Sequence, residues 1–212
     1  MTDQENDIKW REYFYPGTDI LINNYDCKDK DELKEIETNV SFDRLVELME
    51  NPLDYGFDKN HLKMIHKYIF EDIYPFAGQY RNVNMGKAKG TFLFIDKPSD
   101  IDEYLDELFE ETNNRLNSCH GKFEFSEILA NLYTKLIFCH PFREGNGRSI
   151  REFTREFSIE KSKEIGIGTL ELDWRKIDKE ELNRYIEVAH LFPGQTAILF
   201  ESALMPVESK VK

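Results

Sequence analysis

Residues 125–139 carry an apolar row whose spacing leaves few choices of structure. The row recurs at intervals of three and four positions and consists of Phe125, Ile128, Leu129, Leu132, Tyr133, Leu136 and Ile137. This spacing places every member on one face of an α-helix. His140 is the next position on that face, and Pro141 after it favours the end of the helix. The sequence therefore predicts a buried helix that delivers a histidine to the start of a loop.

The loop after this helix has the composition of an anion-binding turn. Starting at His140, the next twelve residues read His-Pro-Phe-Arg-Glu-Gly-Asn-Gly-Arg-Ser-Ile-Arg. Gly145, Asn146 and Gly147 can adopt backbone angles that aim successive N–H groups at one anion, and a following helix adds its positive end. An ordinary surface turn is the alternative for these three residues taken alone. Together with their neighbours they predict a cradle for phosphate groups.

The other polar residues of this stretch complete a candidate nucleotide site. His140 has an unperturbed pKa of about 6.5, so it can accept a proton at neutral pH. Arg148 and Arg151 stand three positions apart on one helix face, where both could clamp phosphate oxygens. Glu144 is a candidate Mg²⁺ ligand, because Mg²⁺ takes one or two carboxylates together with phosphate oxygens. Phe142 is expected to turn inward and anchor the loop.

Length and charge exclude several other classes of protein. The chain has 212 residues and a formal net charge of −13. Because nucleic-acid surfaces need clustered Lys and Arg, no nucleic acid is expected as a partner. No apolar run approaches the roughly 20 residues of a membrane span, so neither a membrane nor a cleavable signal is expected. Three cysteines at unrelated spacings favour a reducing cytoplasm, and export into another cell stays open.

The chain is predicted to form one compact unit in three parts. These are an N-terminal helical arm (1–52), a core (53–205) and a C-terminal tail (206–212), with no linker or repeat between them. Further apolar rows predict helices at 62–73, 101–109, 150–163, 182–189 and 197–204, with Asp178 as an N-cap. The expected fold is therefore mainly α.

Two regions depart from this simple pattern. The arm is expected to hold an acidic helix at 29–38 and a second, separate helix from Phe42 to Met49. Residues 80–85 and 91–95 have strand-like composition around a glycine-bounded loop. This segment predicts one β-hairpin in the helical unit.

The stretch from 140 to 151 resembles the signature of the Fic family, His-x-Phe-x-(Asp/Glu)-Gly-Asn-Gly-Arg-x-x-Arg, and meets every specified position. The resemblance extends over about residues 12–205. It includes the Tyr-Pro-Gly-Thr sequence at 15–18 and the Phe-Ala-Gly sequence at 76–78. It implies the family's fold, a helical bundle with one β-hairpin flap.

The resemblance also implies an activity, protein adenylyltransferase, in which AMP passes from ATP to a Ser, Thr or Tyr hydroxyl of a target protein and pyrophosphate leaves. His140 would take the hydroxyl proton and Glu144 would hold Mg²⁺. The Gly-Asn-Gly turn would bind the α and β phosphates, and Arg148 and Arg151 would bind the pyrophosphate. Gly147 favours AMP as the transferred group, because relatives that transfer phosphate carry lysine there.

The resemblance further implies partners in a bacterial cell. Lys89, Gly90 and Phe94 resemble the flap positions that hold a target backbone as an added strand. The chain has no complete copy of the family's inhibitory sequence, (Ser/Thr)-x-x-x-Glu-(Gly/Asn), which implies a separate small antitoxin. Type II topoisomerase subunits are the first implied targets and host GTPases the second. Two alternatives stay open: transfer of UMP, phosphate or phosphocholine, and a catalytically idle binding module.

Overall fold

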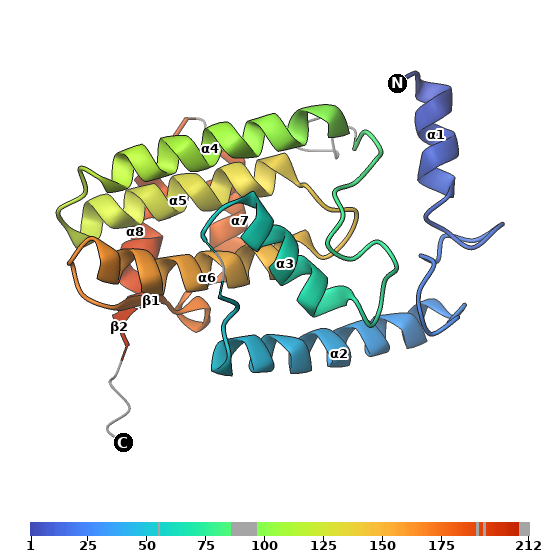
Figure 1. Cartoon of the computed structure of the whole chain (residues 1–212), viewed down its shortest axis with the longest axis horizontal. Helices are drawn as coiled ribbons and strands as arrows, with labels where there is room; N and C mark the ends of the chain where they lie inside the picture. The colour runs from blue at the N-terminus through green and yellow to red at the C-terminus, as the bar shows by residue number, and fades with distance from the viewer. Residues whose placement is uncertain (55, 86–96, 190, 193, 208–212) are drawn as a thin grey trace.

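The computed structural model describes residues 1–54, 56–85, 97–189, 191–192 and 194–207. Within them the chain is a bundle of α-helices with one small antiparallel sheet (Figure 1). The mainly helical class expected from the sequence is therefore confirmed.

The elements of the described chain, in order, are α1 (Asp3–Arg11), α2 (Lys30–Glu50), α3 (Lys59–Phe70), η1 (Pro98–Asp100), α4 (Ile101–Leu116), α5 (Lys122–Cys139), α6 (Asn146–Glu164), β1 (Leu170–Leu172), η2 (Trp174–Lys176), α7 (Lys179–Glu187), α8 (Gly194–Ala203) and β2 (Leu204–Pro206).

Helix α5 is the centre of the bundle. It packs against α4, α6 and α8, and Figure 1 shows α4, α5 and α6 stacked nearly parallel. The apolar row that predicted this helix faces the core, and Phe125, Leu129 and Leu132 are fully buried. Each such side chain contributes about 1.5–3 kcal/mol through its burial. This packing fixes the C-terminal end of α5, where the histidine of the motif lies.

Helix α2 corrects one expectation from the sequence. Lys30–Glu50 is a single helix, whereas two helices were predicted with a break after residue 38. The residues around the expected break contain neither Gly nor Pro, so nothing interrupts the backbone hydrogen bonds there. Phe42 and Met49 of the apolar row are 63% and 56% exposed. Ser41 and Leu48 are buried instead, so the face of α2 toward the bundle is turned by about 100°, one residue, from Phe42 and Met49.

The small sheet was not anticipated from the sequence. β1 pairs with β2 in antiparallel register, with Leu172 opposite Leu204. Strands of three residues are too short to show a period of two, which explains why the pattern missed them. Residues 80–85, predicted as the first strand of a hairpin, form no strand here, and residues 86–96 lie outside the described residues.

Helix α7 begins as predicted. The Asp178 carboxylate accepts a hydrogen bond from the Glu181 N–H at 2.7 Å, which confirms Asp178 as the N-cap. None of the helices in the described part of the chain combines the length and apolar character needed to cross a bilayer.

Candidate active site

His140 ends helix α5 in an unusual backbone conformation. Its φ and ψ are 45° and 59°, in the left-handed region that residues other than glycine seldom adopt. Its N–H still donates to the Leu136 carbonyl at 3.1 Å, so His140 is the last residue tied to the helix. The turn that follows brings the motif loop across the end of α5. A conformation of this kind persists only where the surrounding structure holds it.

Arg81 provides that support. Its guanidinium is buried and donates from Nε to the His140 carbonyl at 2.9 Å and from Nη2 to the Cys139 carbonyl at 3.4 Å. Its backbone N–H donates to the Pro141 carbonyl at 2.9 Å. Nη1 donates to the Val83 carbonyl at 2.7 Å. Arg81 therefore satisfies carbonyls that α5 leaves without helical partners and places a positive charge at the negative end of its dipole.

The same environment sets the protonation of His140. Burial, and to a smaller extent the neighbouring Arg81 cation, lowers the pKa of its imidazole to about 4. The ring is therefore neutral at pH 7 and has a lone pair available for a proton. The sequence predicted a group titrating near 6.5; the structure moves it down because the site is enclosed.

A second histidine, His66 on α3, also supports the motif loop and was not anticipated from the sequence. The fully buried ring of Phe142 stacks on His66, with centroids 3.8 Å apart and planes 17° apart. His66 Nδ1 accepts a hydrogen bond from the Gly78 N–H at 2.8 Å, which assigns the ring proton to Nε2. Nε2 then donates to the Glu144 carbonyl at 2.9 Å. Burial lowers the pKa of His66 to about 4, so this arrangement is neutral.

Gly145 and Asn146 shape the entry to helix α6. Gly145 has φ 80°, and a Cβ there would lie 2.4 Å from the Phe70 ring, so the position excludes a side chain. The Asn146 side chain accepts from the Phe142 N–H at 2.9 Å and donates to the Phe142 carbonyl at 2.8 Å. Its amide therefore closes the loop. The N–H groups of the first helical turn have no helical acceptor and converge at this end of α6.

Gly147 corrects the expectation of an unusual backbone. It lies inside α6, and only Gly145 of the two glycines has a positive φ. What Gly147 provides is space: a Cβ there would lie 3.4 Å from Arg151 Nη1. The Arg151 side chain folds back along the first turn and also approaches Tyr133. Burial raises the pKa of Tyr133, and the nearby Arg151 cation partly opposes this shift. Within the described residues Arg151 forms no ion pair.

Arg148 is engaged differently. Its guanidinium forms an ion pair with Glu37 on α2, donates to the Ser41 hydroxyl at 3.0 Å, and lies 4.7 Å from the centroid of the Phe70 ring. Glu37 also accepts a hydrogen bond from the Tyr74 hydroxyl. The sequence placed both motif arginines together toward the loop. In the structure Arg148 is held by α2, while Arg151 lies along the first turn of α6.

Glu144 stands directly before this turn. One of its carboxylate oxygens accepts a hydrogen bond from the Gly145 N–H at 3.0 Å, and the residue is half-buried. In the described part of the chain no group of three or more His, Cys, Asp or Glu residues is arranged to hold a metal ion. The flap residues of the sequence prediction, Lys89, Gly90 and Phe94, lie outside the described residues.

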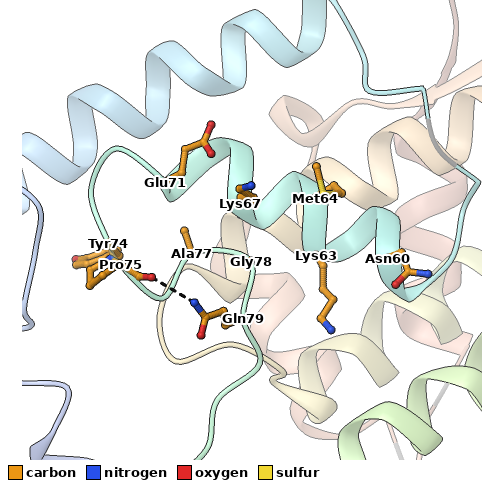
Figure 2. A pocket seen from close by; sticks show the side chains of 10 residues that line it. All are labelled: Asn60, Lys63, Met64, Lys67, Glu71, Tyr74, Pro75, Ala77, Gly78 and Gln79. Carbon is orange, nitrogen blue, oxygen red and sulfur yellow. Dashed lines mark hydrogen bonds between the residues drawn. The ribbon is translucent and has the colours of Figure 1, made fainter.

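A separate groove lies on the outer side of helix α3. It has a volume of about 580 Å³, and Lys63 and Lys67 contribute to its wall together with the loop that contains Gly78 (Figure 2). No residue of 140–151 lines it. His66, on the same helix, faces the motif loop instead, so α3 separates the groove from the candidate active site.

Three comparisons place this geometry among known proteins. The family model described as Fic/DOC family matches residues 56–158. Protein adenylyltransferase VbhT of Bartonella schoenbuchensis is 30% identical over 174 residues, which cover 81% of this chain and 34% of VbhT. The probable protein adenylyltransferase y4lH of Sinorhizobium fredii is 33% identical over 138 residues, which cover 64% of this chain and 68% of y4lH.

A solved structure agrees with these relatives. BepC, a VirB-translocated effector protein of Bartonella tribocorum crystallised with bound AMPPNP, superposes with a TM-score of 0.77 and 26% sequence identity. The match covers 93% of this chain and 98% of that chain. The chain therefore belongs to the Fic/DOC family. It spans about a third of the length of VbhT.

Proposed function

We propose that this Fic-family protein adenylyltransferase transfers AMP from ATP to a Ser, Thr or Tyr hydroxyl of a target protein, with His140 as the general base. The hydroxyl oxygen attacks the α-phosphorus, the bond from that phosphorus to the bridging oxygen breaks, and pyrophosphate leaves with the bonding electrons. The hydroxyl proton passes to His140. The observation that carries this proposal is a neutral, half-buried imidazole placed one short loop away from the open N-terminus of α6.

The protonation of His140 supports the role of base. A pKa of about 4 leaves the imidazole unprotonated at pH 7, so it is ready to accept a proton. A triphosphate bound beside it would raise that pKa, because negative charge favours the protonated form. The buried Arg81 holds the backbone of His140 and so fixes the position from which the ring acts.

Phosphate binding would rest on the first turn of α6. The N–H groups of Asn146, Gly147 and Arg148 have no helical acceptors, and a helix N-terminus carries a partial positive charge. Arg151 lies along the same turn and could reach phosphate oxygens. Arg148 could take part only by sharing its guanidinium with Glu37 or by exchanging that carboxylate for a phosphate.

Glu144 fits a Mg²⁺ ion bound together with the nucleotide. Mg²⁺ usually retains water and phosphate oxygens around one or two carboxylates, and Glu144 is a carboxylate held next to the phosphate-binding turn. When bound, the ion would neutralise phosphate charge. The Glu144 side chain is oriented for this by the Gly145 N–H, and its backbone by His66.

The partners are part of the proposal. Lys89, Gly90 and Phe94 would hold the target backbone as an added strand, and a small antitoxin with the missing inhibitory sequence would restrain the enzyme. Bacterial type II topoisomerase subunits are the first targets to test. The support is the Fic signature and the absence of a complete inhibitory sequence in the chain.

Two radiolabels of ATP test the reaction. The purified chain, with Mg²⁺ and bacterial lysate, is incubated with ATP labelled at the α or at the γ phosphate, and His140→Ala serves as the matched control. Label from the α position alone, lost in His140→Ala, supports AMP transfer. Label from the γ position would replace it with phosphate transfer. No label, together with no Mg-ATP binding in calorimetry, would favour an idle binding module.

A further inference from the structure

Helix α1 is attached to the molecule in an unusual way. None of its residues is buried, so it does not contribute an apolar face to the core. A nine-residue helix of this kind is marginal on its own in water. Its position must therefore come from a few specific contacts, and in Figure 1 it stands apart from the helical bundle.

The first set of contacts joins the N-terminal region to residues 82–84. The Asn6 side chain accepts from the Asn84 N–H at 2.6 Å and donates to the Asn84 carbonyl at 3.2 Å. The amide of Asn6 thus pairs with a backbone as a neighbouring strand would. The Tyr13 hydroxyl donates to the Asn82 side chain at 2.9 Å. This segment directly follows Arg81, which holds the His140 carbonyl.

The second attachment is a cation enclosed by aromatic rings. The Arg143 guanidinium carbon lies 4.1 Å from the Trp10 ring centroid, 5.2 Å from that of Phe14 and 5.4 Å from that of Tyr13. Trp10 lies in the last turn of α1, and Tyr13 and Phe14 follow shortly after the helix ends. Arg143 is 8% exposed, and its Nε has no hydrogen-bond acceptor among the described residues.

The enclosure has an energetic cost that the rings offset. Arg143 is buried, so its charge is largely separated from water. Within the described residues Arg143 forms no ion pair, so contacts with the faces of the aromatic rings offset part of this cost. Cation–π contacts gain strength when the cation is desolvated. The motif loop is therefore attached to the N-terminal region through Arg143.

We propose that residues 3–14 form a strut that connects the motif loop to segment 82–84, and that Arg143 is a positioning residue for the proposed AMP transfer, on which this role rests. Arg143 lies three residues after His140 and directly before Glu144. Segment 82–84 lies directly after Arg81. The strut thus holds both chain segments that orient the base.

Two measurements on a set of variants test the strut. Trp10→Leu keeps apolar bulk and removes the aromatic face, Trp10→Phe restores an aromatic face, and Arg11→Ala is the matched control on the exposed side of α1. The first measurement is hydrogen exchange, read by mass spectrometry over residues 81–85 and 140–148. The second is the transfer rate at saturating ATP together with the KM for ATP.

Trp10→Leu is expected to speed exchange in both segments about fivefold and to lower the transfer rate by about the same factor, the order of magnitude of one cation–π contact when two other rings remain. The KM for ATP should stay within about twofold, because the phosphate-binding turn keeps its own partners. Trp10→Phe should return both the exchange rate and the transfer rate most of the way to the wild-type values. Arg11→Ala should change neither rate. Arg143→Met combined with Trp10→Leu should be no slower than Arg143→Met alone.

Two results would overturn the strut. One is unchanged exchange over 140–148 in Trp10→Leu; the other is a double variant in which the two losses multiply. If Trp10→Leu fails to fold, Asn6→Ala replaces it and must speed exchange in 82–84 and lower the transfer rate. If the wild-type chain transfers no AMP, the proposed function fails, while the exchange experiment still decides whether the strut exists.

Discussion

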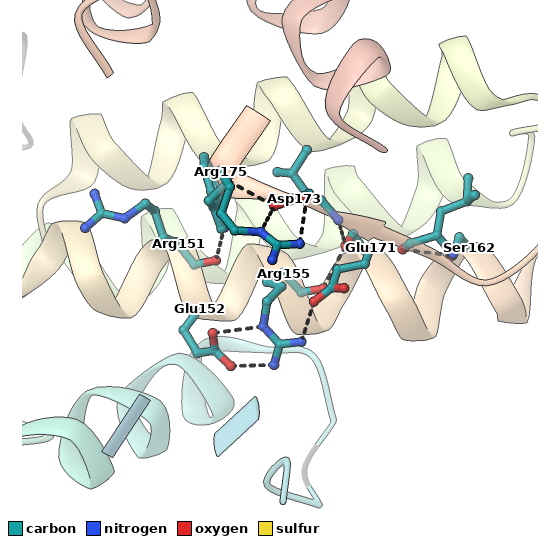
Figure 3. A network of polar contacts seen from close by, with 11 residues as sticks. Arg151, Glu152, Arg155, Ser162, Glu171, Asp173 and Arg175 are labelled. Carbon is teal, nitrogen blue, oxygen red and sulfur yellow. Dashed lines mark hydrogen bonds and ion pairs between the residues drawn. The ribbon is translucent and has the colours of Figure 1, made fainter. Parts of the chain in front are cut away.

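The first turn of helix α6 and its later part, from Glu152 to Ser158, hold polar groups in different ways. At the first turn, the N–H groups of residues 146–148 have no helical acceptors, and the hydrogen bonds that support the turn come largely from other parts of the chain. Further along, the Arg155 guanidinium donates to the Glu152 carboxylate at 3.0 and 2.6 Å and to Glu171 at 3.1 Å (Figure 3). The buried Ser158 hydroxyl accepts from the Leu172 N–H at 2.9 Å and so ties α6 to β1.

The difference shows how one helix can serve chemistry and stability at once. In its later part the charge of Arg155 is balanced by carboxylates on α6 and β1, which favours a rigid attachment. At its first turn the binding groups stay open because Arg81, His66 and Asn146 hold the loop without using those N–H groups. A ligand can then bind there without displacing structural hydrogen bonds. Four predictions test this division, beginning with the largest effect.

Removing the Arg155 cation from the later part of α6 should cost the most stability. Arg155→Met leaves the buried Glu152 and the half-buried Glu171 without their partner, and breaking a buried pair in this way costs about 3–5 kcal/mol. Urea unfolding followed by circular dichroism measures the change. The double variant Arg155→Met with Glu152→Met should recover much of the loss. A loss of unfolding free energy below about 1 kcal/mol for the single variant would show that these ion pairs do not hold the later part of α6.

Removing the cation that supports the first turn should instead act on the reaction. Arg81→Met releases the His140 carbonyl, so the base moves and AMP transfer is expected to fall about 100-fold at saturating Mg-ATP. Arg81→Lys keeps a charge and one donor and should recover part of the rate. The measurement is single-turnover transfer from α-labelled ATP. An unchanged rate in a folded Arg81→Met protein would contradict the positioning role.

The two motif arginines should differ in nucleotide affinity. Arg151→Ala is expected to weaken Mg-ATP binding about tenfold, since it removes a charged hydrogen-bond donor along the phosphate-binding turn. Arg148→Ala should weaken binding less than about threefold, because that guanidinium is already paired with Glu37. Isothermal titration calorimetry measures both. The reverse order would show that Arg148 leaves Glu37 for the phosphate.

The last prediction concerns the two neutral histidines. Folding lowers the pKa of His140 and of His66 to about 4, so between about pH 6.5 and 4 the unfolded chain binds more protons than the folded one. The contribution of these histidines to the free energy of unfolding is therefore present above pH 6.5. It is lost as the pH falls, by up to about 1.4 kcal/mol per pH unit for each histidine.

Urea unfolding between pH 6.5 and 5 isolates this effect, since most carboxylates titrate lower. His140→Gln should reduce the slope by about half, because it removes one of the two groups. Stability that stays level across this window would show that the two imidazoles are not held neutral in the folded chain.

Several features could be read from residue spacing alone. The apolar rows predicted α5 and the later part of α6, and Asp178 was correctly placed as the cap of α7, because these signals lie within a few residues of each other. The single helix α2 and the β1–β2 pair were missed, the first because a change in composition was mistaken for a boundary. Residues 80–85 form no strand, whereas the rest of the predicted hairpin, with Lys89, Gly90 and Phe94, remains a prediction.

By itself the sequence determined the helical class and brought the candidate groups of residues 140–151 together, because both are encoded in neighbours along the chain. Only the tertiary structure decided how those groups are held. His140 is supported by Arg81 from 59 residues away, the Glu144 carbonyl by His66 from 78, and Arg148 is paired with Glu37 from 111. Such partners carry no periodic signal, since a buried polar group requires a hydrogen bond but does not specify where in the chain its partner lies.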